Sequence, residues 1–313
     1  MSKKIGLIPK ENLVKRIGSA YSGAARSIVA ILRDLDPMTY TDSEGSVALS
    51  KIRGIVDRLD ALAAAWAVQS IKAAYGESQK ISRTRLEAIG AEQTNVKKGR
   101  HEKAIKKMAR LTMRDYLDAN RTILKNAGKY LSVMAHAKRK MDRYREDVKA
   151  EAFSSAEVRD MIDSTVRQAL RTTSKYNAGT AHLTSKTIAR KIMSKLMGHL
   201  EGQDFIVIKG KDGKERNYNL RSYSEMVART RMREAQSKAT IEMCKDYDND
   251  LVQWSQHSEP CPDCALLEGQ IFSISGKHPE YPALTGDVEP PLHPNCEHNL
   301  NPTSDNALHW RNA

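Results

Sequence analysis

The hydrophobic positions of the first part of the chain repeat at helical spacing. Between Pro9 and Leu35 apolar residues recur every three or four positions, and Asp36-Pro37 should end this helix because proline cannot continue it. A polar loop then leads to a second apolar face from Leu49 to Trp66. Residues 76–103 are highly charged with weak periodicity, which predicts a shorter helix followed by an exposed connection.

A heptad-like pattern follows between Leu117 and Val148. One row of apolar positions is Leu117, Leu124 and Leu131, and the other is Ala127, Met134, Met141 and Val148. This spacing predicts a long helix that packs along a neighbour, with Gly128 as the position where a kink or break is expected. Two more helices are expected at residues 155–173 and 184–200, the first opened by a capping box at Ser154–Glu157.

The pattern changes near residue 200. Phe205–Ile208 is prone to form a strand, Lys211–Lys214 resembles a hairpin turn, and Tyr218–Leu220 is the expected return strand. A capping box at Ser222–Glu225 predicts a helix from Tyr223 to about Lys245, and "DNDLVQWSQ" and "EGQIFSIS" predict two further strands. The predicted fold class is mainly α: a long helical region over residues 1–200, then a small α+β domain over residues 201–313.

Charge divides the chain at the same place. Residues 1–200 carry 39 Lys and Arg against 20 Asp and Glu, whereas residues 201–313 carry 12 against 18. A polycation followed by a mildly acidic module suggests that the helical region faces a polyanion such as nucleic acid, although a solvated lysine-rich surface explains the charge equally well. No segment reaches the roughly 18 apolar residues of a membrane span, so no membrane partner is expected.

Cysteine and histidine cluster near the C-terminal end. "CPDC" at 261–264 is followed by "HPNCEH" at 293–298, and together they hold three of the four cysteines. Cys261, Cys264, His293 and Cys296 have the pairwise spacing of a tetrahedral zinc site, with His298 as the alternative fourth ligand. We expect the zinc to be structural, and we expect Cys244 on the preceding helix to be a small buried side chain.

Two other interpretations of these residues are weaker. A redox Cys-x-x-Cys pair requires a thioredoxin-like βαβ unit, and the flanking sequence does not resemble one. "HSEPCPDC" contains the His-x-Glu and Pro-Cys-x-x-Cys pieces of zinc deaminases, but here the pieces abut, so His257 cannot present that geometry. A zinc-dependent nuclease or hydrolase acting on DNA, with His257 or His298 as base, remains the alternative function.

The C-terminal segments resemble a known family. "YSEMVARTRMREA", "DLVQWSQH", "CPDCALLEGQIFSISG", "YPAL" and "PPLHPNCEHNLNP" are similar, in order over roughly residues 200–302, to tailed-phage minor capsid proteins of the broader Mu F-like head morphogenesis group. The resemblance implies a non-enzymatic structural protein of the virion. It implies that the protein lies in the capsid interior near the portal vertex in the virion, and in the host cytoplasm during assembly. Its implied partners are the portal protein, the major capsid protein, or both, and its implied role is to assist head assembly, DNA packaging or ejection.

The resemblance also assigns residues. The Cys-x-x-Cys of the family corresponds to Cys261 and Cys264, and its His-Pro-x-Cys to His293 and Cys296. Where the family often continues with Arg and then Cys or His, this chain has Glu297 and His298. The family's Arg-Thr-x-x-Arg-Glu helix corresponds to Arg229, Arg233 and Glu234, for which we expect a structural role between the helix and the zinc loops.

Two basic clusters are candidates for non-specific contact with packaged double-stranded DNA. In the first, four residues share one helical face because they are spaced i, i+3, i+4 and i+7; the whole cluster is Lys97, Lys98, Arg100, Lys103, Lys106, Lys107 and Arg110. The second comprises Lys138, Arg139, Lys140, Arg143 and Arg145. The alternative for both is a solvated helix face.

Overall fold

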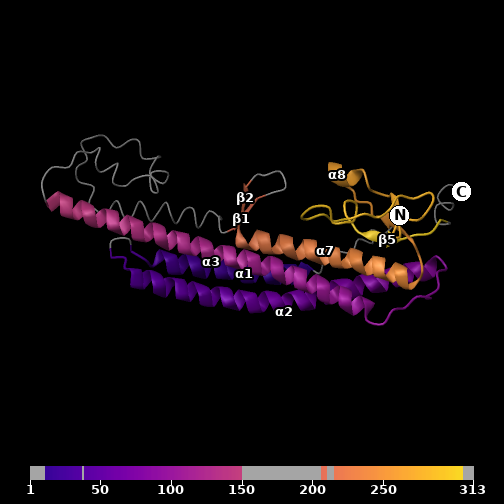
Figure 1. Ribbon diagram of the computed structural model, residues 1–313, viewed down its shortest axis with the longest axis horizontal. Helices are drawn as coiled ribbons and strands as arrows, with labels where there is room; N and C mark the ends of the chain where they lie inside the picture. Colours follow the sequence, from indigo (N-terminus) through magenta and orange to yellow (C-terminus); the bar gives the residue numbers. More distant parts are fainter. Residues whose placement is uncertain (1–10, 37–38, 150–205, 210–214, 306–313) are drawn as a thin grey trace. The chain divides into compact units, whose positions relative to one another are not determined.

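The computed structural model describes residues 11–36, 39–149, 206–209 and 215–305 (Figure 1). Three long helices come first: α1 (Glu11–Arg33), α2 (Asp42–Ala88) and α3 (Arg100–Lys149). They are followed by the hairpin strands β1 (Ile206–Lys209) and β2 (Glu215–Tyr218), and by helix α7 (Leu220–Asp246). The C-terminal part holds β3 (Leu251–Trp254), the short helix α8 (Pro262–Ala265), β4 (Ile271–Ser273) and β5 (Leu300–Pro302).

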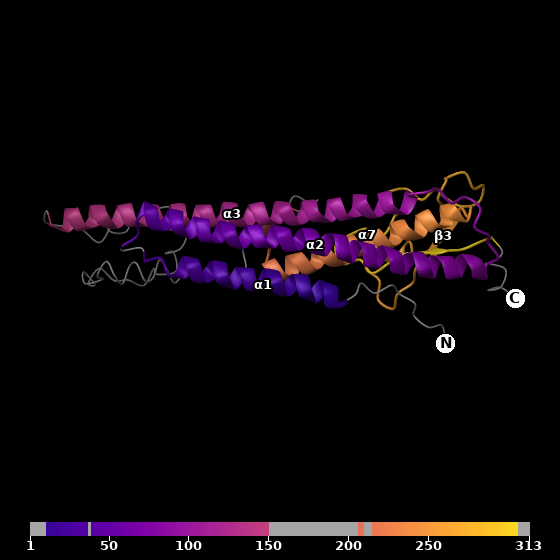
Figure 2. The ribbon, with the colours of Figure 1, turned by 90° about the horizontal axis from the view of Figure 1, so that it is seen from below.

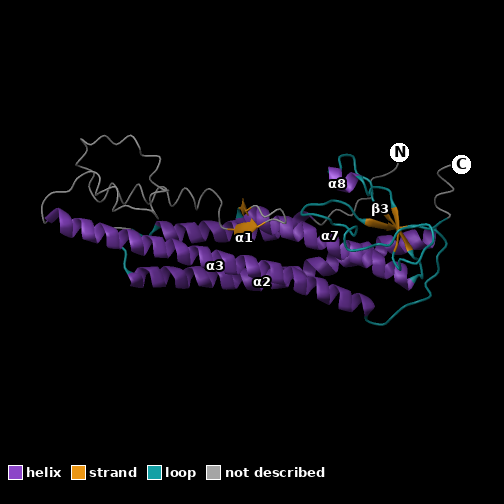
Figure 3. Cartoon of the chain, turned by 45° about the horizontal axis from the view of Figure 1, so that its top comes forward, coloured by secondary structure: helices purple, strands orange, loops and turns teal. Residues whose placement is uncertain are grey.

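The mainly helical class and the small antiparallel sheet are therefore confirmed (Figure 3). Strands β1 and β2 pair as the predicted hairpin, with Ile206 opposite Tyr218. Strand β3 is the centre of the second sheet, in the order β4-β3-β5, with Val252 opposite Phe272 on one side and Pro302 on the other. Strand β5 was not predicted.

The helices differ from the prediction in length rather than in position. Helix α2 continues without a break to Ala88, so the separate shorter helix expected after residue 76 is wrong, and residues 89–99 form the connection (Figure 2). Helix α3 runs through Gly128 without interruption, since one residue of weak propensity costs only about 1 kcal/mol in a helix of this length. The two helices expected at 155–173 and 184–200 lie outside the described residues.

The start of α7 corrects the predicted capping box. The side-chain oxygen of Asn219 accepts the backbone N–H of Ser222 at 2.7 Å, so Asn219 caps the helix three residues before the predicted position. Asparagine is as good an N-cap as serine, and the sequence offers both.

The described residues pack as two compact units. One unit takes its residues from the ranges Met1–Ser19, Ala61–Tyr116 and Ser224–Ala313, and the other from Ala20–Asp60 and Leu117–Tyr223. The predicted division near residue 200 falls in a segment that is not described, so it stays a prediction. Within the first unit, however, the C-terminal module shares its core with parts of α2 and α3 rather than standing alone.

The described residues of the second unit form an apolar core that includes a polar contact. Tyr21, Ile52 and Ile123 are each fully buried there. The side-chain amide of Asn120 donates to the carboxylate of Asp60 at 2.5 Å, and burial strongly raises the pKa of Tyr21. The heptad positions Ala127, Leu131 and Met134 are buried as predicted.

In the first unit α7 is buried on nearly all sides although it is rich in polar residues. Ser224, Gln236, Ser237 and Thr240 are each at most 1% exposed. Helix α2 supplies partners: the Ser78 hydroxyl donates to the Gln236 carbonyl at 2.8 Å, and the hydroxyls of Ser82 and Thr240 are 3.0 Å apart. Buried polar groups require such bonds, so these contacts fix how α7 packs on α2.

None of the helices in the described part of the chain has the length and apolar character required to cross a bilayer.

Candidate metal centre

The first pair of cysteines is positioned by the start of α8. Cys261 is the N-cap of this helix, and its sulfur accepts the backbone N–H of Cys264 at 3.4 Å. Pro262 occupies the first helical turn, where its fixed φ favours the helix and its missing N–H costs nothing. This turn brings the two sulfurs to the same side, as the Cys-x-x-Cys spacing predicts.

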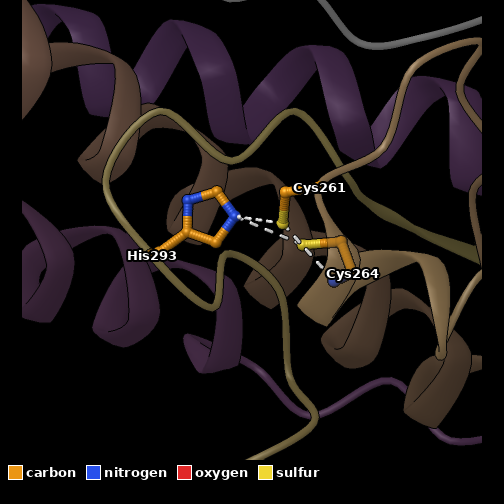
Figure 4. A group of neighbouring side chains, drawn as sticks. All are labelled: Cys261, Cys264 and His293. Atoms are coloured by element: carbon orange, nitrogen blue, oxygen red, sulfur yellow. Dashed lines mark hydrogen bonds between the residues drawn. The ribbon is translucent and has the colours of Figure 1, made fainter.

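His293 completes a first triad with these cysteines. Its Nε2 lies 3.2 Å from the sulfur of Cys261 and 3.3 Å from that of Cys264 (Figure 4). The other ring nitrogen, Nδ1, is 2.9 Å from the carbonyl of Pro294, which can only accept a hydrogen bond. The proton is therefore placed on Nδ1, and the lone pair of Nε2 is directed at the sulfurs.

A second triad shares Cys264 with the first. The Cys264 and Cys296 sulfurs are 3.8 Å apart, and His298 Nδ1 is 3.6 Å from the Cys296 sulfur. Donor atoms within each triad lie within 4.8 Å of one another, a spacing that can hold a metal ion. The two triads share Cys264 and together include all four sequence-predicted ligands and the alternative His298, which gives five candidate donors.

The second triad is the more deeply buried. Cys264, Cys296 and His298 are all buried, whereas Cys261 and His293 are partly exposed. The ring of His298 contacts Trp254 with centroids 5.2 Å apart and His257 with centroids 4.5 Å apart. Its Nε2 is 2.8 Å from the carboxylate of Glu268. Sequence reasoning missed Glu268, which is 30 positions away along the chain.

The electrostatics of the sulfurs differ between the two cysteines of the turn. The backbone N–H of Cys264 lowers the pKa of Cys261, because it stabilises the thiolate. Burial and the neighbouring sulfurs raise the pKa of Cys264. In this buried setting the thiolate form of Cys264 is unfavourable on its own. A bound cation would stabilise it.

The centre lies against the apolar core of the first unit. Trp254, Phe272 and Leu300 from the sheet pack in the same cluster as Cys264 and Cys296, together with Leu86 of α2. Cys244 is fully buried in this cluster, and burial raises its pKa to about 12, so it behaves as the predicted small apolar side chain.

The three residues of the Arg-Thr-x-x-Arg-Glu helix do not act as one group. Arg233 is 5% exposed, burial lowers its pKa to about 10, and its charge is partly balanced by Glu297 and Cys296 on the metal loop. Arg229 instead pairs with Glu225 at 3.1 Å within α7. Glu234 pairs with Arg231 at 2.6 Å, and Arg231 also reaches Asp115 of α3 at 2.6 Å.

A buried charge network joins α2, α3 and α7 within the first unit and was not predicted. Asp246 accepts from Arg100 at 2.7 Å and lies 2.8 Å from Nε2 of His101. The Tyr75 hydroxyl is 2.9 Å from Nδ1 of the same imidazole. Arg100 was predicted to contact nucleic acid, but its side chain is only 13% exposed and belongs to this network.

The remaining basic candidates differ in exposure. In the first cluster Lys97, Lys98, Lys103, Lys106, Lys107 and Arg110 are exposed, and Lys106 forms an i,i+4 pair with Glu102. In the second cluster Arg139 is exposed, and Lys138 pairs with Asp142 at 2.5 Å. The side chains of Lys140, Arg143 and Arg145 lie outside the described residues.

The comparisons with known proteins agree with the resemblance noted in the sequence. The family model described as phage minor capsid protein 2 matches residues 78–303, which extends well beyond the C-terminal module to the end of α2 and all of α3. Searches of the curated proteins and of the solved structures return no match. The matched range contains both triads and the charged residues of the buried network, Arg100, His101 and Asp246, and it covers more than half of the chain. The chain therefore belongs to the phage minor capsid protein 2 family, a family of structural proteins of the virion.

Proposed function

We propose that this protein associates with the portal or the major capsid protein on the capsid interior of a tailed phage. There it contacts packaged double-stranded DNA and assists head assembly, packaging or ejection. Family membership supports the virion role. The observation that carries the DNA contact is the exposed basic row on α3, and the donor cluster supports a structural zinc.

The basic row lies on the part of α3 in the first unit. Lys103, Lys107 and Arg110 are exposed and spaced i, i+4 and i+7, and Arg114 continues the row. Phosphates repeat along DNA at a spacing that such a row can follow, and each neutralised phosphate releases counterions. Contact of this kind requires no base-specific side chains, as expected for packaging of any sequence.

The DNA contact is tested by the salt dependence of binding. We expect Lys103→Gln/Lys107→Gln/Arg110→Gln to weaken binding and to reduce the slope of log K against log salt by up to about 3, since each phosphate contact contributes about 0.9. The matched control is Lys51→Gln/Arg53→Gln/Arg58→Gln, which removes the same charge from exposed positions of α2. Equal loss in both variants, or binding that does not change with salt, contradicts the proposal.

Zinc fits the donor types and their separations. Zinc–sulfur bonds of about 2.3 Å and zinc–nitrogen bonds of about 2.0–2.1 Å imply tetrahedron edges of about 3.8 Å between sulfurs and about 3.5 Å between sulfur and nitrogen. The Cys264–Cys296 separation of 3.8 Å and the Cys296–His298 separation of 3.6 Å agree with these edges. Four protein ligands leave zinc no open position for a substrate, so the role assigned to it is structural.

Chelation distinguishes the structural role from the alternative nuclease. We expect the purified chain to contain one zinc per molecule and to lose thermal stability when a strong chelator removes it. Metal-dependent cleavage of DNA by the untreated chain, absent after chelation with the fold intact, supports the enzyme instead.

The partner is tested by purification from infected cells. We expect the chain to co-purify with portal complexes or capsid protein from procapsids, at a low copy number relative to capsid subunits. Recovery only as free protein, with none in procapsids or virions, contradicts the assignment.

A further inference from the structure

The two triads that share Cys264 offer five donors, one more than the four that a closed zinc site needs, and the two imidazoles are not equivalent. Both rings direct a lone pair toward sulfur, so tautomer alone does not separate them. They differ in what holds the ring, in the rigidity of the backbone that carries it, and in burial. These differences decide which imidazole remains with the metal.

The ring of His298 is held by a carboxylate from another segment. Glu268 accepts the Nε2–H at 2.8 Å, which leaves Nδ1 as the lone-pair nitrogen facing Cys296. A carboxylate behind a metal-bound imidazole fixes its orientation and raises its basicity. The same Glu268 oxygen accepts the backbone N–H of His257 at 2.7 Å, so the carboxylate is itself held in place.

The backbone around His298 is fixed by the sheet. Strand β5 begins two residues later and pairs with β3, with Leu300 opposite Trp254. Both backbone polar groups of the next residue, Asn299, bond to Ser255. The Asn299 carbonyl accepts the Ser255 N–H at 2.9 Å, and the Asn299 N–H donates to the Ser255 hydroxyl at 3.0 Å. A metal ligand next to a hydrogen-bonded strand is positioned more precisely than a ligand on a loop.

His293 has a weaker setting. It is partly exposed, and exposed Pro294 and Asn295 follow it in the turn. The hydrogen bond of its Nδ1 goes to the carbonyl of the adjacent residue, so among the described residues no group from another segment holds this nitrogen. Its Nε2 lies near the sulfurs of Cys261 and Cys264, whereas Cys264 and Cys296 form the second, buried triad with His298.

We propose that His298, held by Glu268, is the permanent imidazole ligand of this centre beside Cys261, Cys264 and Cys296, and that His293 is a dispensable fifth donor. The inference rests on the proposed structural metal site. It assigns Glu268 as a positioning residue that acts on the metal through His298, and it reverses the ligand preference drawn from the sequence.

Cobalt(II) substitution tests the assignment on the full chain, because its d–d and thiolate-to-metal charge-transfer bands report the donors directly. We expect His293→Gln to keep the band pattern of the wild type, with cobalt affinity reduced less than about tenfold, whereas His298→Gln changes the bands and loses more affinity than that. Glu268→Gln keeps an acceptor for both N–H groups but removes the charge, and should weaken cobalt binding about 10- to 100-fold with the bands retained. Cys244→Ala is the matched control for substitution of a buried residue.

His298→Cys keeps the test decisive if His298→Gln does not fold. A fourth thiolate should then increase the charge-transfer intensity, whereas intensity equal to the wild type shows that residue 298 is not a ligand and overturns the proposal. Altered bands in His293→Gln together with unchanged bands in His298→Gln also overturn it. Failure of the wild type to take up cobalt or zinc refutes the underlying metal site instead.

Discussion

Removal of the buried carboxylate of Asp246 should destabilise the first unit far more than removal of an exposed one. The Asp246 side chain is 4% exposed and accepts from Arg100 at 2.7 Å, with His101 at 2.8 Å. His101 in turn lies 2.9 Å from the hydroxyl of Tyr75, a fully buried residue. Asp246→Asn keeps the shape of the side chain but removes the charge that these donors face.

The size of the effect follows from burial. A hydrogen bond to a charged group contributes about 1.5–3 kcal/mol, and loss of one partner of a buried ion pair costs about 3–5 kcal/mol. Arg100 keeps a second carboxylate, since Glu242 lies 3.8 Å from its Nε. We therefore expect the lower end of the range, about 3 kcal/mol, for Asp246→Asn.

Urea unfolding followed by far-ultraviolet circular dichroism measures the loss. With a slope of about 2 kcal/mol per molar urea, the midpoint of the transition of the first unit should fall by about 1.5 M. The matched control is Asp287→Asn, which makes the same chemical change at an exposed position of the same unit. Its expected cost is below about 1 kcal/mol.

The reasoning is refuted if the two variants unfold at the same urea concentration. A double-mutant cycle with Arg100→Met adds a second check, because paired residues should show a coupling energy of about 0.5–3 kcal/mol. Additive losses in Asp246→Asn and Arg100→Met mean that the network does not act as a unit.

Three further predictions follow from single buried groups. Glu289 lines a cavity of about 350 Å³ with Lys107 and Glu234, and burial raises its pKa. Ionisation of Glu289 therefore opposes folding above the unfolded-state pKa. In thermal unfolding, Glu289→Gln should stabilise the chain at pH 7 and lose this advantage below about pH 4. Cys244, with its pKa raised to about 12, should resist alkylation at pH 8 in the folded chain and react after denaturation, as mass spectrometry would report; modification of the native chain at this residue contradicts its burial. Ala239 is fully buried against Tyr75 and Ala104, so Ala239→Leu should cost about 1–3 kcal/mol in urea unfolding, whereas Ala61→Leu at an exposed position of α2 should cost almost nothing.

The long helices and the convergence of the Cys and His residues were predictable because their signals are local. Apolar periodicity is a property of neighbouring residues, and the pairs Cys261-Cys264 and His293-Cys296 each lie within one turn of chain. The hairpin of β1 and β2 was predictable for the same reason.

Features that depend on distant partners were missed. Arg100 was assigned to a basic cluster because its neighbours along the chain are basic, yet its anions, Asp246 and Glu242, lie more than 140 positions away. The burial of the polar residues of α7 was not predicted, because it depends on hydroxyls of α2. Strand β5 is three residues long and contains Pro302, so only its pairing with β3 identifies it.

The burial of α7 among polar contacts has a consequence for synthesis of the chain on the ribosome. Ser78 is bonded to Gln236, 158 positions later, so α2 must emerge long before the helix that satisfies its hydroxyls. Until then α2 and α3 can form as local helices, but the core of the first unit is incomplete without α7. Contacts of such long range slow folding. The metal loops are translated later still. Completion of the first unit therefore has to wait until α7 and the metal loops have been translated. Nascent chains that stop before α7 should expose the surface of α2 that α7 covers, and chaperones should bind it.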